Sequence, residues 1–261
     1  MHAETGPFYL EIAGGIATLT IDRPPVNAFS VSTYQALLEH IHTIEQRDDV
    51  RVVILAARED ARCWCGGADL NDFVGMDSEA RHERYEFINA VIPRFYALER
   101  PVIAAITSHA IGIGVMLAAA CDLRVASVDA QFSTPEVDYG LIAGSSRLLN
   151  YLGMNEALVR ELAYTGRRAS AQELLASGLL NRVVPRGEVL AEARALAQTI
   201  ATKSLPVLRA RKKAFVEHEN LGWLDAYRLA QALSGDLVAL SDSQEGVNAF
   251  LERRTAQVQD S

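Results

Sequence analysis

Two glycine-bearing turns carry the residue spacing that best suits chemistry on a bound ligand. One is CGGADL at 65–70, and the other is HAIGIG at 109–114, directly before an apolar helix. Glycines let the backbone approach a ligand closely, and the first amides of a helix lack intrahelical acceptors. Two such amides aimed at one oxygen form an oxyanion hole, which stabilises developing negative charge. Either turn alone is equally compatible with an ordinary strand-to-helix connection.

The second turn also resembles part of a dinucleotide-binding fingerprint. That motif requires a third glycine, and Leu117 stands in its place. We therefore interpret this turn as a source of free amides rather than as a nucleotide loop.

The elements that position these turns follow from the spacing of apolar residues. Two short alternating runs around Ala13-Gly14-Gly15 predict a hairpin, and a helix capped by Ser32 or Thr33 precedes the next strand. After Gly140 strand patterns nearly vanish, so the sequence predicts an α/β core followed by a helical C-terminal third. The predicted strands are 8–12, 16–21, 50–56, 102–106, 123–126 and 182–184, and the predicted helices are 79–98, 113–120, 189–200, 207–215 and 224–240.

Composition excludes several classes of function. The chain has 261 residues and a net charge of −8, whereas a nucleic-acid-binding protein normally presents a basic face. The three cysteines are unevenly spaced and lack the paired spacing and partner histidines of a zinc site. We therefore expect no nucleic-acid partner and no metal.

One apolar segment, 102–121, is long enough to cross a membrane. Thr107, Ser108 and His109 lie near its middle, so a buried strand, a turn and a buried helix explain it better. The N-terminus shows no signal-peptide pattern, and the cysteine usage fits a reducing compartment. We expect a cytoplasmic protein without a membrane partner.

Several segments, in order, carry a resemblance to a known family. The chain resembles the enoyl-CoA hydratase/isomerase, or crotonase, family along nearly its whole length. The segments are RPPVNAFS at 23–30, GGADL at 66–70, PVIAAI at 101–106, CDLRVA at 121–126, FSTPEV at 132–137, and Glu245-Gly246 with Phe250.

The resemblance implies a fold, an assembly and a substrate class. The fold is α/β, with a crotonase-like ββα spiral core at 1–195 that carries the acyl-CoA site. A helical region at 196–261 mediates trimerisation, so a homotrimer or a dimer of trimers is expected. The partner is an acyl-CoA thioester whose carbonyl becomes an enolate, and coenzyme A enters as part of the substrate with no separate cofactor.

Carried over by position, the resemblance assigns the oxyanion-hole amides to Ala68 and Ile113. In many relatives a glycine stands at the position of Ile113, whose branched side chain here narrows or tilts the acyl pocket. Phe250 contacts coenzyme A from a neighbouring helix or subunit. The implied substrate- and coenzyme A-binding residues are Val26, Ala28, Gly66, Ala68, Asp69, Leu70, His109, Gly112, Ile113, Pro135, Glu136 and Phe250.

The hydratases of this family use two glutamates, and only one is retained here. Met116 stands three residues after Ile113, where a glutamate is expected, and Glu136 is retained as acid/base. One carboxylate suffices to move a proton between C2 and C4 of a 3-enoyl-CoA, so isomerisation is favoured over efficient hydration. The alternatives are a hydratase that uses a second acid such as Asp138, and a catalytically inactive coenzyme A-binding paralogue.

The segment 140–147 is shortened relative to the glycine-rich loop common in relatives. Either Ser145 or Ser146 caps the following helix, or these serines donate hydrogen bonds to a substrate or water. His109 is equally compatible with a structural, hydrogen-bonded histidine. A peptidase is a further alternative, because the protease ClpP has a similar fold, although no serine-nucleophile motif supports it.

Overall fold

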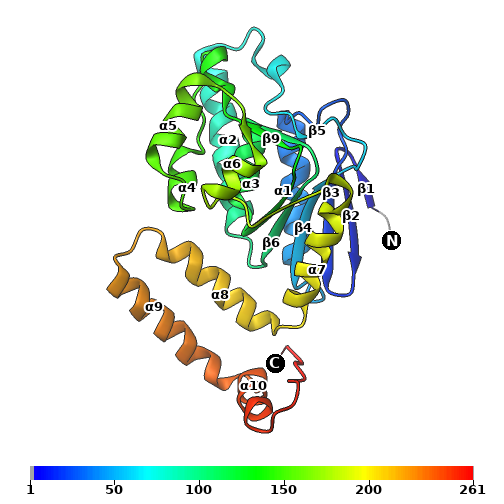
Figure 1. Ribbon diagram of the computed structural model, residues 1–261, viewed down its shortest axis with the longest axis vertical. Helices are drawn as coiled ribbons and strands as arrows, with labels where there is room; N and C mark the ends of the chain where they lie inside the picture. Colours follow the sequence, from blue (N-terminus) through cyan, green and yellow to red (C-terminus); the bar gives the residue numbers. More distant parts are fainter. Residues whose placement is uncertain (1–2, 261) are drawn as a thin grey trace.

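Two β-sheets with helices packed on them form the core of the computed structural model, which describes residues 3–260 (Figure 1). From β3 to β11 in the larger sheet neighbouring strands are parallel, whereas its first three strands are antiparallel. The larger sheet has the order β1 (Ala3–Thr5), β2 (Phe8–Ala13), β3 (Ile16–Ile21), β4 (Val52–Ala57), β6 (Val102–Ile106), β8 (Leu123–Ser127) and β11 (Arg182–Val184). The smaller sheet has the order β10 (Ala169–Ser170), β9 (Gln131–Ser133), β7 (His109–Ile111) and β5 (Cys63–Cys65).

Three pairs of consecutive strands each place one strand in the larger sheet and the next in the smaller sheet before a helical element. Strands β4 and β5 precede α2 (Ser78–Tyr96), and β6 and β7 precede α3 (Ile113–Ala120). Strands β8 and β9 precede a 3₁₀ helix, η2 (Pro135–Tyr139). This repetition is the predicted ββα spiral, and the α/β fold class is confirmed. The smaller sheet was not predicted, because strands of two or three residues are too short to show a period of two.

The central strands of the larger sheet are buried on both faces, which explains their uninterrupted apolar sequences. Alternate residues of β4 enter two cores: Val53 and Leu55 face the core that contains α1 (Val31–Glu45). The opposite face is covered by α7 (Val189–Ala201). That second core contains Val52, Ile54, Ala56, Ile103, Ala105, Val125, Val189, Ala193 and Ala197.

Helix α1 begins two to three residues earlier than the predicted caps imply. Ser30 is the N-cap, since its Oγ accepts a hydrogen bond from Thr33 N at 3.4 Å. Thr33 Oγ1 in turn accepts from Ser30 N at 3.3 Å, which completes a capping box. The predicted cap at Ser32 or Thr33 was therefore wrong, although Thr33 supplies the reciprocal bond.

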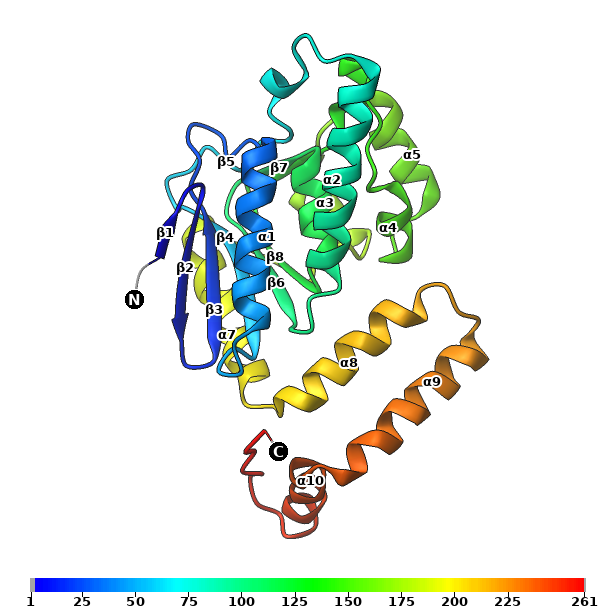
Figure 2. The same ribbon diagram turned by 180° about the vertical axis from the view of Figure 1, so that it is seen from behind.

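Three C-terminal helices project away from the two sheets (Figure 2). They are α8 (Leu205–His218), α9 (Trp223–Asp236) and α10 (Ser241–Leu251). The predicted helical C-terminal region is confirmed. The predicted domain limit after residue 195 falls within α7, which packs on the larger sheet, so the projecting part begins at Leu205.

A partly buried ion pair fastens α8 to the residue that precedes β8. Lys212 Nζ lies 2.8 Å from both carboxylate oxygens of Asp122, and one of these oxygens also accepts from Val102 N at 2.7 Å. The ammonium group additionally lies 5.2 Å from the ring centroid of Tyr96. Only 3% of the Lys212 side chain is exposed, so its charge depends on these partners.

We predict that Lys212→Met lowers the free energy of unfolding by about 3 kcal/mol, because removing one partner leaves the Asp122 carboxylate without its cation. Urea unfolding at fixed protein concentration measures this change. Lys213→Met is the matched control. Lys213 forms an exposed ion pair with Glu217 at 3.8 Å, so we expect a change below about 0.5 kcal/mol. Equal effects of the two substitutions would contradict the stabilising role of the Lys212–Asp122 ion pair.

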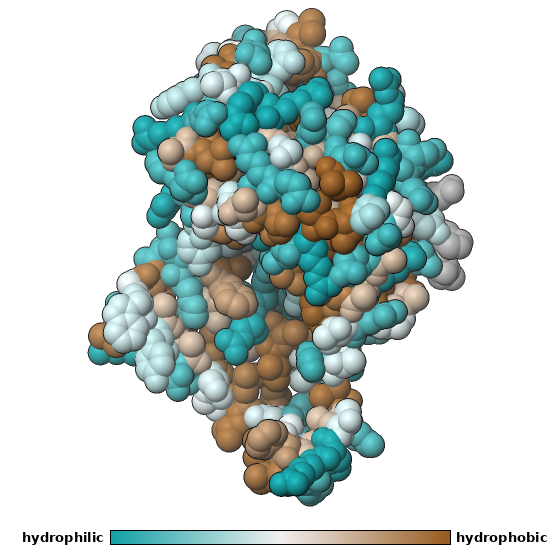
Figure 3. All heavy atoms as spheres, viewed as in Figure 1, coloured by the Kyte–Doolittle hydropathy of each residue, from teal (hydrophilic) through white to brown (hydrophobic). Residues whose placement is uncertain are grey.

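Hydrophobic residues, coloured brown, gather along the hollow between the sheets and the C-terminal helices (Figure 3). No helix within residues 3–260 is long and apolar enough to span a membrane. The exposed large apolar residues of the C-terminal helices and their connections are Phe215, Leu221, Trp223, Leu224, Tyr227, Val238, Val247, Phe250 and Leu251.

Candidate functional site

The first glycine turn follows β5 and lies against the loop that carries Val26. Gly66 N donates a hydrogen bond to Val26 O at 2.8 Å, and a β-carbon on Gly66 would lie only 2.7 Å from that oxygen. The buried Asn27 supports the same loop, because its Nδ2 donates to Cys63 O at 2.9 Å. This close packing of two backbones requires glycine at position 66.

Ala68 lies between two residues that bind Phe29 through the backbone. Phe29 N donates to Gly67 O at 2.8 Å, and Asp69 N donates to Phe29 O at 2.9 Å. Within the described chain, no hydrogen bond is donated by the Ala68 amide. That N–H is therefore available to an acceptor on a ligand.

The element after Ala68 is shorter than an α-helix. It is a single 3₁₀ turn, η1 (Leu70–Phe73), with Asp69 as N-cap accepting from Asn71 N at 3.1 Å. Arg23 binds the Asp69 carboxylate at 2.6 Å, and this hydrogen bond lowers the pKa of Asp69. A four-residue turn has little macrodipole, so what this turn offers a ligand is the single N–H of Ala68 rather than the field of a helix end.

The second glycine turn presents the amide of Ile113 at the start of α3. Gly112 has φ of 53°, a conformation that favours glycine, and its amide donates to Ser133 O at 2.8 Å. Val115 N and Met116 N both donate to Gly112 O, at 2.9 and 3.3 Å. As the first helical residue, Ile113 donates no backbone hydrogen bond to any described residue.

Glu136, on η2, lies directly against the second glycine turn. A β-carbon built on Gly112 would lie 2.9 Å from Glu136 Oε1, so the missing side chain of the glycine makes room for the carboxylate. Burial raises the pKa of Glu136, and Oε2 is enclosed without a hydrogen-bond partner among the described residues. Both features favour a carboxyl group that exchanges a proton.

One cavity of about 280 Å³ brings these groups together. Ala68, Gly112, Ile113 and Glu136 all contribute to its wall, although they come from three separate segments of the chain. The remaining lining residues are Tyr34, Phe73, Arg84, Tyr85, Ile88, Asn89, Ile92, Pro93, Met116, Leu141, Ile142, Ala143, Gly144 and Ser145.

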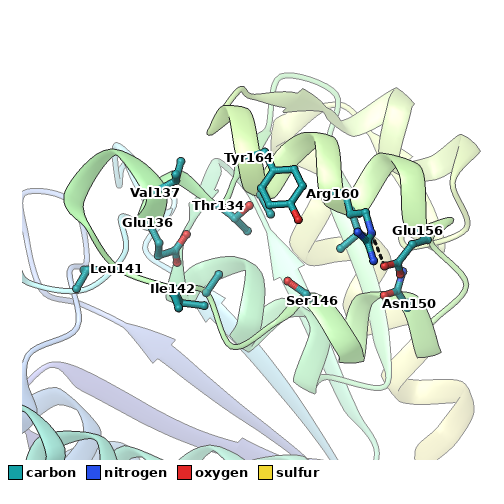
Figure 4. Close-up of a pocket in the computed structure, with 13 residues that line it drawn as sticks. Thr134, Glu136, Val137, Leu141, Ile142, Ser146, Asn150, Glu156, Arg160 and Tyr164 are labelled. Atoms are coloured by element: carbon teal, nitrogen blue, oxygen red, sulfur yellow. Dashed lines mark hydrogen bonds and ion pairs between the residues drawn. The ribbon is translucent and has the colours of Figure 1, made fainter.

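A second cavity, of about 400 Å³, adjoins Glu136 from the side of α5 (Glu156–Thr165) (Figure 4). The segment 141–143 lines both cavities and Leu141 N donates to Glu136 O at 2.9 Å, which ties this segment to the carboxylate. Arg160 and Glu156 on the far wall form an exposed ion pair at 2.6 Å. Glu136 therefore lies between two spaces rather than at the end of one.

The two candidates for a second proton-transfer group have different surroundings. Met116 lines the 280 Å³ cavity, as its spacing from Ile113 predicts, and it carries no ionisable group. Asp138 faces elsewhere, because its Oδ2 lies 2.9 Å from where a β-carbon of Gly166 would be. Asp138 lines neither cavity that Glu136 lines.

Other predicted binding residues lie outside both cavities. His109 Nδ1 accepts a hydrogen bond from Gln131 N at 3.2 Å, and burial lowers the pKa of His109. Phe250 is 81% exposed on α10, which lies at the opposite end of the molecule from α3 (Figure 1). Coenzyme A contacts stay predictions for Val26, Ala28, Gly66, Asp69, Leu70, His109, Pro135 and Phe250.

The predicted capping of α4 (Ser146–Tyr151) by a serine side chain is wrong for Ser145. Ser145 occupies the N-cap position, but its side chain makes no capping hydrogen bond. Its Oγ is buried without a partner among the described residues, and Ser145 lines the 280 Å³ cavity. The expected capping bond is absent because Ser145 has helical φ and ψ rather than the extended conformation of a capping serine.

The polar residues on the α1 and α2 side of the cavity were missed by sequence reasoning. Arg84 precedes Ile88 and Ile92 at intervals of four, so it stands on the apolar face of α2. An arginine within an apolar stripe was the available signal. Tyr34 gave no comparable signal, because a tyrosine in a buried helix face is ordinary.

The three cysteines are free thiols, and burial raises the pKa of both Cys65 and Cys121 to about 12. Residues 3–260 contain no group of three His, Cys, Asp or Glu side chains placed to hold a metal ion. The thiols therefore have the surroundings of structural rather than reactive cysteines.

Comparison with known proteins gives a match to a family model described as enoyl-CoA hydratase/isomerase over residues 11–261. The chain belongs to the enoyl-CoA hydratase/isomerase family. A probable enoyl-CoA hydratase of Bacillus subtilis is 32% identical over 250 residues, which are 93% of this chain and 94% of the relative. A short-chain-enoyl-CoA hydratase of Clostridium acetobutylicum is 30% identical over 94% of each chain.

Solved structures agree with this assignment to the enoyl-CoA hydratase/isomerase family. An enoyl-CoA hydratase of Geobacillus kaustophilus superposes with a TM-score of 0.94 at 25% identity, over 100% of this chain and 99% of that chain. DspI of Pseudomonas aeruginosa superposes with a TM-score of 0.93 at 28% identity, over 98% of each chain. The family consists of lyases and isomerases acting on acyl-CoA thioesters, so the chain is an enzyme of that kind.

Proposed function

We propose that this enzyme binds a 3-enoyl-CoA in the 280 Å³ cavity and isomerises it to a 2-enoyl-CoA through a thioester enolate. The amides of Ala68 and Ile113 donate hydrogen bonds to the thioester oxygen as it gains negative charge. The Glu136 carboxylate removes a proton from C2 and returns it to C4. The reaction is redox-neutral, so coenzyme A enters with the substrate and no separate cofactor is needed.

Two geometric features support the oxyanion hole. The Ala68 and Ile113 amides lack acceptors in the described chain, and both residues line the cavity that contains Glu136. Free donors held by rigid turns need no reorganisation when charge develops, which is the basis of electrostatic catalysis.

The preference for isomerisation over hydration rests on the number of carboxyl groups in the cavity. Among the described residues that line the cavity, Glu136 is the only one with a carboxyl group, and Met116 supplies none. The carboxylate that takes the C2 proton is the acid that releases it at C4, so a single group completes the isomerisation. Hydration instead needs water to be positioned and activated while a second proton is transferred.

Paired assays test this proposal. Purified enzyme is incubated with a 3-enoyl-CoA and, separately, with the 2-enoyl-CoA of equal length, and isomerisation and hydration are followed by chromatography. We expect kcat/KM for isomerisation to exceed that for hydration by at least about 10-fold. Faster hydration than isomerisation would overturn the proposal.

Hydration is the second candidate function. It is favoured by relatives that bear the name enoyl-CoA hydratase. The direction of Asp138 toward Gly166 argues against its use as the second acid. A catalytically inactive coenzyme A-binding protein is the remaining alternative, and binding of thioesters without turnover of any enoyl-CoA would support it.

Activity should depend on pH through Glu136. Burial raises the pKa of this carboxyl group above its ordinary value, and only the ionised form removes the C2 proton. We therefore expect kcat/KM for isomerisation to fall as the pH drops through that raised pKa. A pH profile measures this inflection, and a profile that falls only at the ordinary glutamate value would contradict it.

The raised pKa of Glu136 also affects stability, which changes with pH in the opposite direction to activity. Between the ordinary and the raised pKa, the folded chain holds the Glu136 proton while the unfolded chain has released it. Stability therefore falls as the pH rises through this window. Urea unfolding across this pH window should therefore show a larger loss of stability in wild type than in Glu136→Gln, and the difference between the two measures the contribution of Glu136.

We further propose that the C-terminal helices assemble three chains, as a homotrimer or a dimer of trimers, in the cytoplasm. Large apolar side chains exposed on α9 and α10 support burial against another copy, including Trp223 at 80% and Phe250 at 81% exposure. Assembly would also offer a route for Phe250 to reach a neighbouring coenzyme A site. Light scattering of the purified protein tests the assembly, and a monomer would contradict it.

A further inference from the structure

Arg84 is a buried cation in the wall of the 280 Å³ cavity, and the proposed proton transfer does not use it. It lies on the inner face of α2, and only 6% of the residue is exposed. Its side chain joins a wall that is otherwise largely apolar, with Ile88, Ile113 and Met116 among the neighbours. A buried charge in such surroundings is costly unless it has partners or binds a ligand.

The partners of the Arg84 guanidinium leave most of its hydrogen-bonding capacity unused. Asp72 Oδ2 lies 3.6 Å from Nη2, beyond a hydrogen bond, and it accepts instead from Val31 N at 3.0 Å. The guanidinium carbon lies 4.4 Å from the ring centroid of Phe73. Nε and Nη2 are enclosed and have no hydrogen-bond partner among the described residues.

The third guanidinium nitrogen of Arg84 is the one that a ligand can reach. Nη1 is not among the enclosed unpaired atoms, and the described chain offers it no hydrogen bond. Arg84 lines the cavity while its Nε and Nη2 are enclosed, so Nη1 is the nitrogen left to donate into that space. A polar ligand group there would bind a cation that the protein only partly neutralises.

Tyr34 provides a second donor on the same wall. The residue is 2% exposed, and its ring packs edge-on against Phe29 with centroids 5.2 Å apart. Burial raises the pKa of Tyr34, so the hydroxyl remains protonated and can donate. Its oxygen is not among the enclosed unpaired atoms, and Tyr34 lines the cavity beside Arg84.

We propose that the cavity selects an acyl-CoA whose acyl chain ends in a carboxylate, received by Arg84 and Tyr34. This inference rests on the proposed function for the acyl-CoA ligand and adds the class of acyl group. A carboxylate supplies the charge and the acceptors that the guanidinium and the phenol lack. An alkyl chain would cover both donors and shield them from water without offering an acceptor, which a polar site penalises strongly.

Equilibrium binding of saturated thioesters tests the proposal. Calorimetry compares succinyl-, glutaryl- and adipyl-CoA with butanoyl-, pentanoyl- and hexanoyl-CoA, which have equal chain lengths but no terminal carboxylate. We expect at least one carboxylated thioester to bind about 10-fold more tightly than its alkyl counterpart. If none of the three does so, the proposal is overturned.

Two variants locate this preference in the named side chains. Arg84→Met should weaken binding of the preferred carboxylated thioester by about 10- to 100-fold and of its alkyl counterpart by less than about 3-fold. Tyr34→Phe should weaken only the carboxylated thioester, by about 3- to 10-fold. Equal losses for both thioesters would assign Arg84 to holding Asp72 and Phe73 in place, and would overturn the proposal.

A further variant and the choice of saturated thioesters distinguish failure of this inference from failure of the proposed function. Arg84→Lys retains the charge and should recover part of the preference if Arg84→Met unfolds. Saturated thioesters undergo no isomerisation, so their relative affinities do not depend on Glu136 acting as a base. Failure of every thioester to bind would overturn the proposed function, whereas tight binding without a carboxylate preference would overturn only this inference.

Discussion

Glu136→Gln is expected to lower kcat/KM for isomerisation of a 3-enoyl-CoA by roughly 10²–10⁴-fold, the usual contribution of a positioned acid or base. Glutamine has nearly the same shape and fits against Gly112, but it cannot accept the C2 proton. The free amides of Ala68 and Ile113 remain, so substrate affinity should change little. Steady-state kinetics measures kcat/KM, and calorimetry with a saturated thioester measures the affinity.

Asp138→Asn is the matched control for Glu136→Gln. Both carboxylates lie on η2, but Asp138 faces Gly166 and lines neither cavity. We expect Asp138→Asn to change kcat/KM by less than about 3-fold, since only a group beside the reacting atoms contributes a proton-transfer factor. Full activity of Glu136→Gln, or a larger loss in Asp138→Asn, would show that another group is the base.

Met116→Glu is expected to raise kcat/KM for hydration of a 2-enoyl-CoA by roughly 10²-fold, because it adds a second carboxyl group to the cavity. Met116 lies on α3, three residues after Ile113, and already lines the cavity. A glutamate there shares a helix face with Ile113 and faces the space that Glu136 lines. Hydration is followed by the loss of absorbance of the conjugated thioester.

Met116→Gln separates acid–base chemistry from a change in polarity. It introduces a polar side chain of similar size without an ionisable group, so hydration should stay within about 3-fold of wild type. No gain in Met116→Glu, or an equal gain in both variants, would contradict the idea that the missing carboxylate limits hydration.

The two turns show how far local sequence reaches. Gly112 at positive φ is a requirement of its turn, and a glycine at such a position is a signal that the sequence shows directly. The need for glycine at position 66 comes instead from Val26 O on a distant segment. The strands β4 and β6 could also be predicted from their apolar sequences, because burial of both faces leaves little place for polar residues. Resemblance of ordered segments then connected the turns to acyl-CoA chemistry.

The direction in which a side chain points was harder to predict than the element on which it lies. Glu136 and Asp138 are two residues apart on one 3₁₀ helix, yet one lies over Gly112 and the other against Gly166. Ser145 occupies an N-cap position without making the capping bond, and its hydroxyl is enclosed beside the cavity. Neither outcome follows from residue spacing, because each depends on which other segment packs against the side chain.

By itself, the sequence determined the α/β class, most of the long helices, and the paired turns that offer free amides. These depend on interactions between residues near one another in the chain. Only the tertiary structure decided that Ala68, Ile113 and Glu136 share one cavity and that Arg84 and Tyr34 complete its wall. The physical reason is that contacts between distant segments depend on how the sheets and helices pack, and no local periodicity encodes that packing.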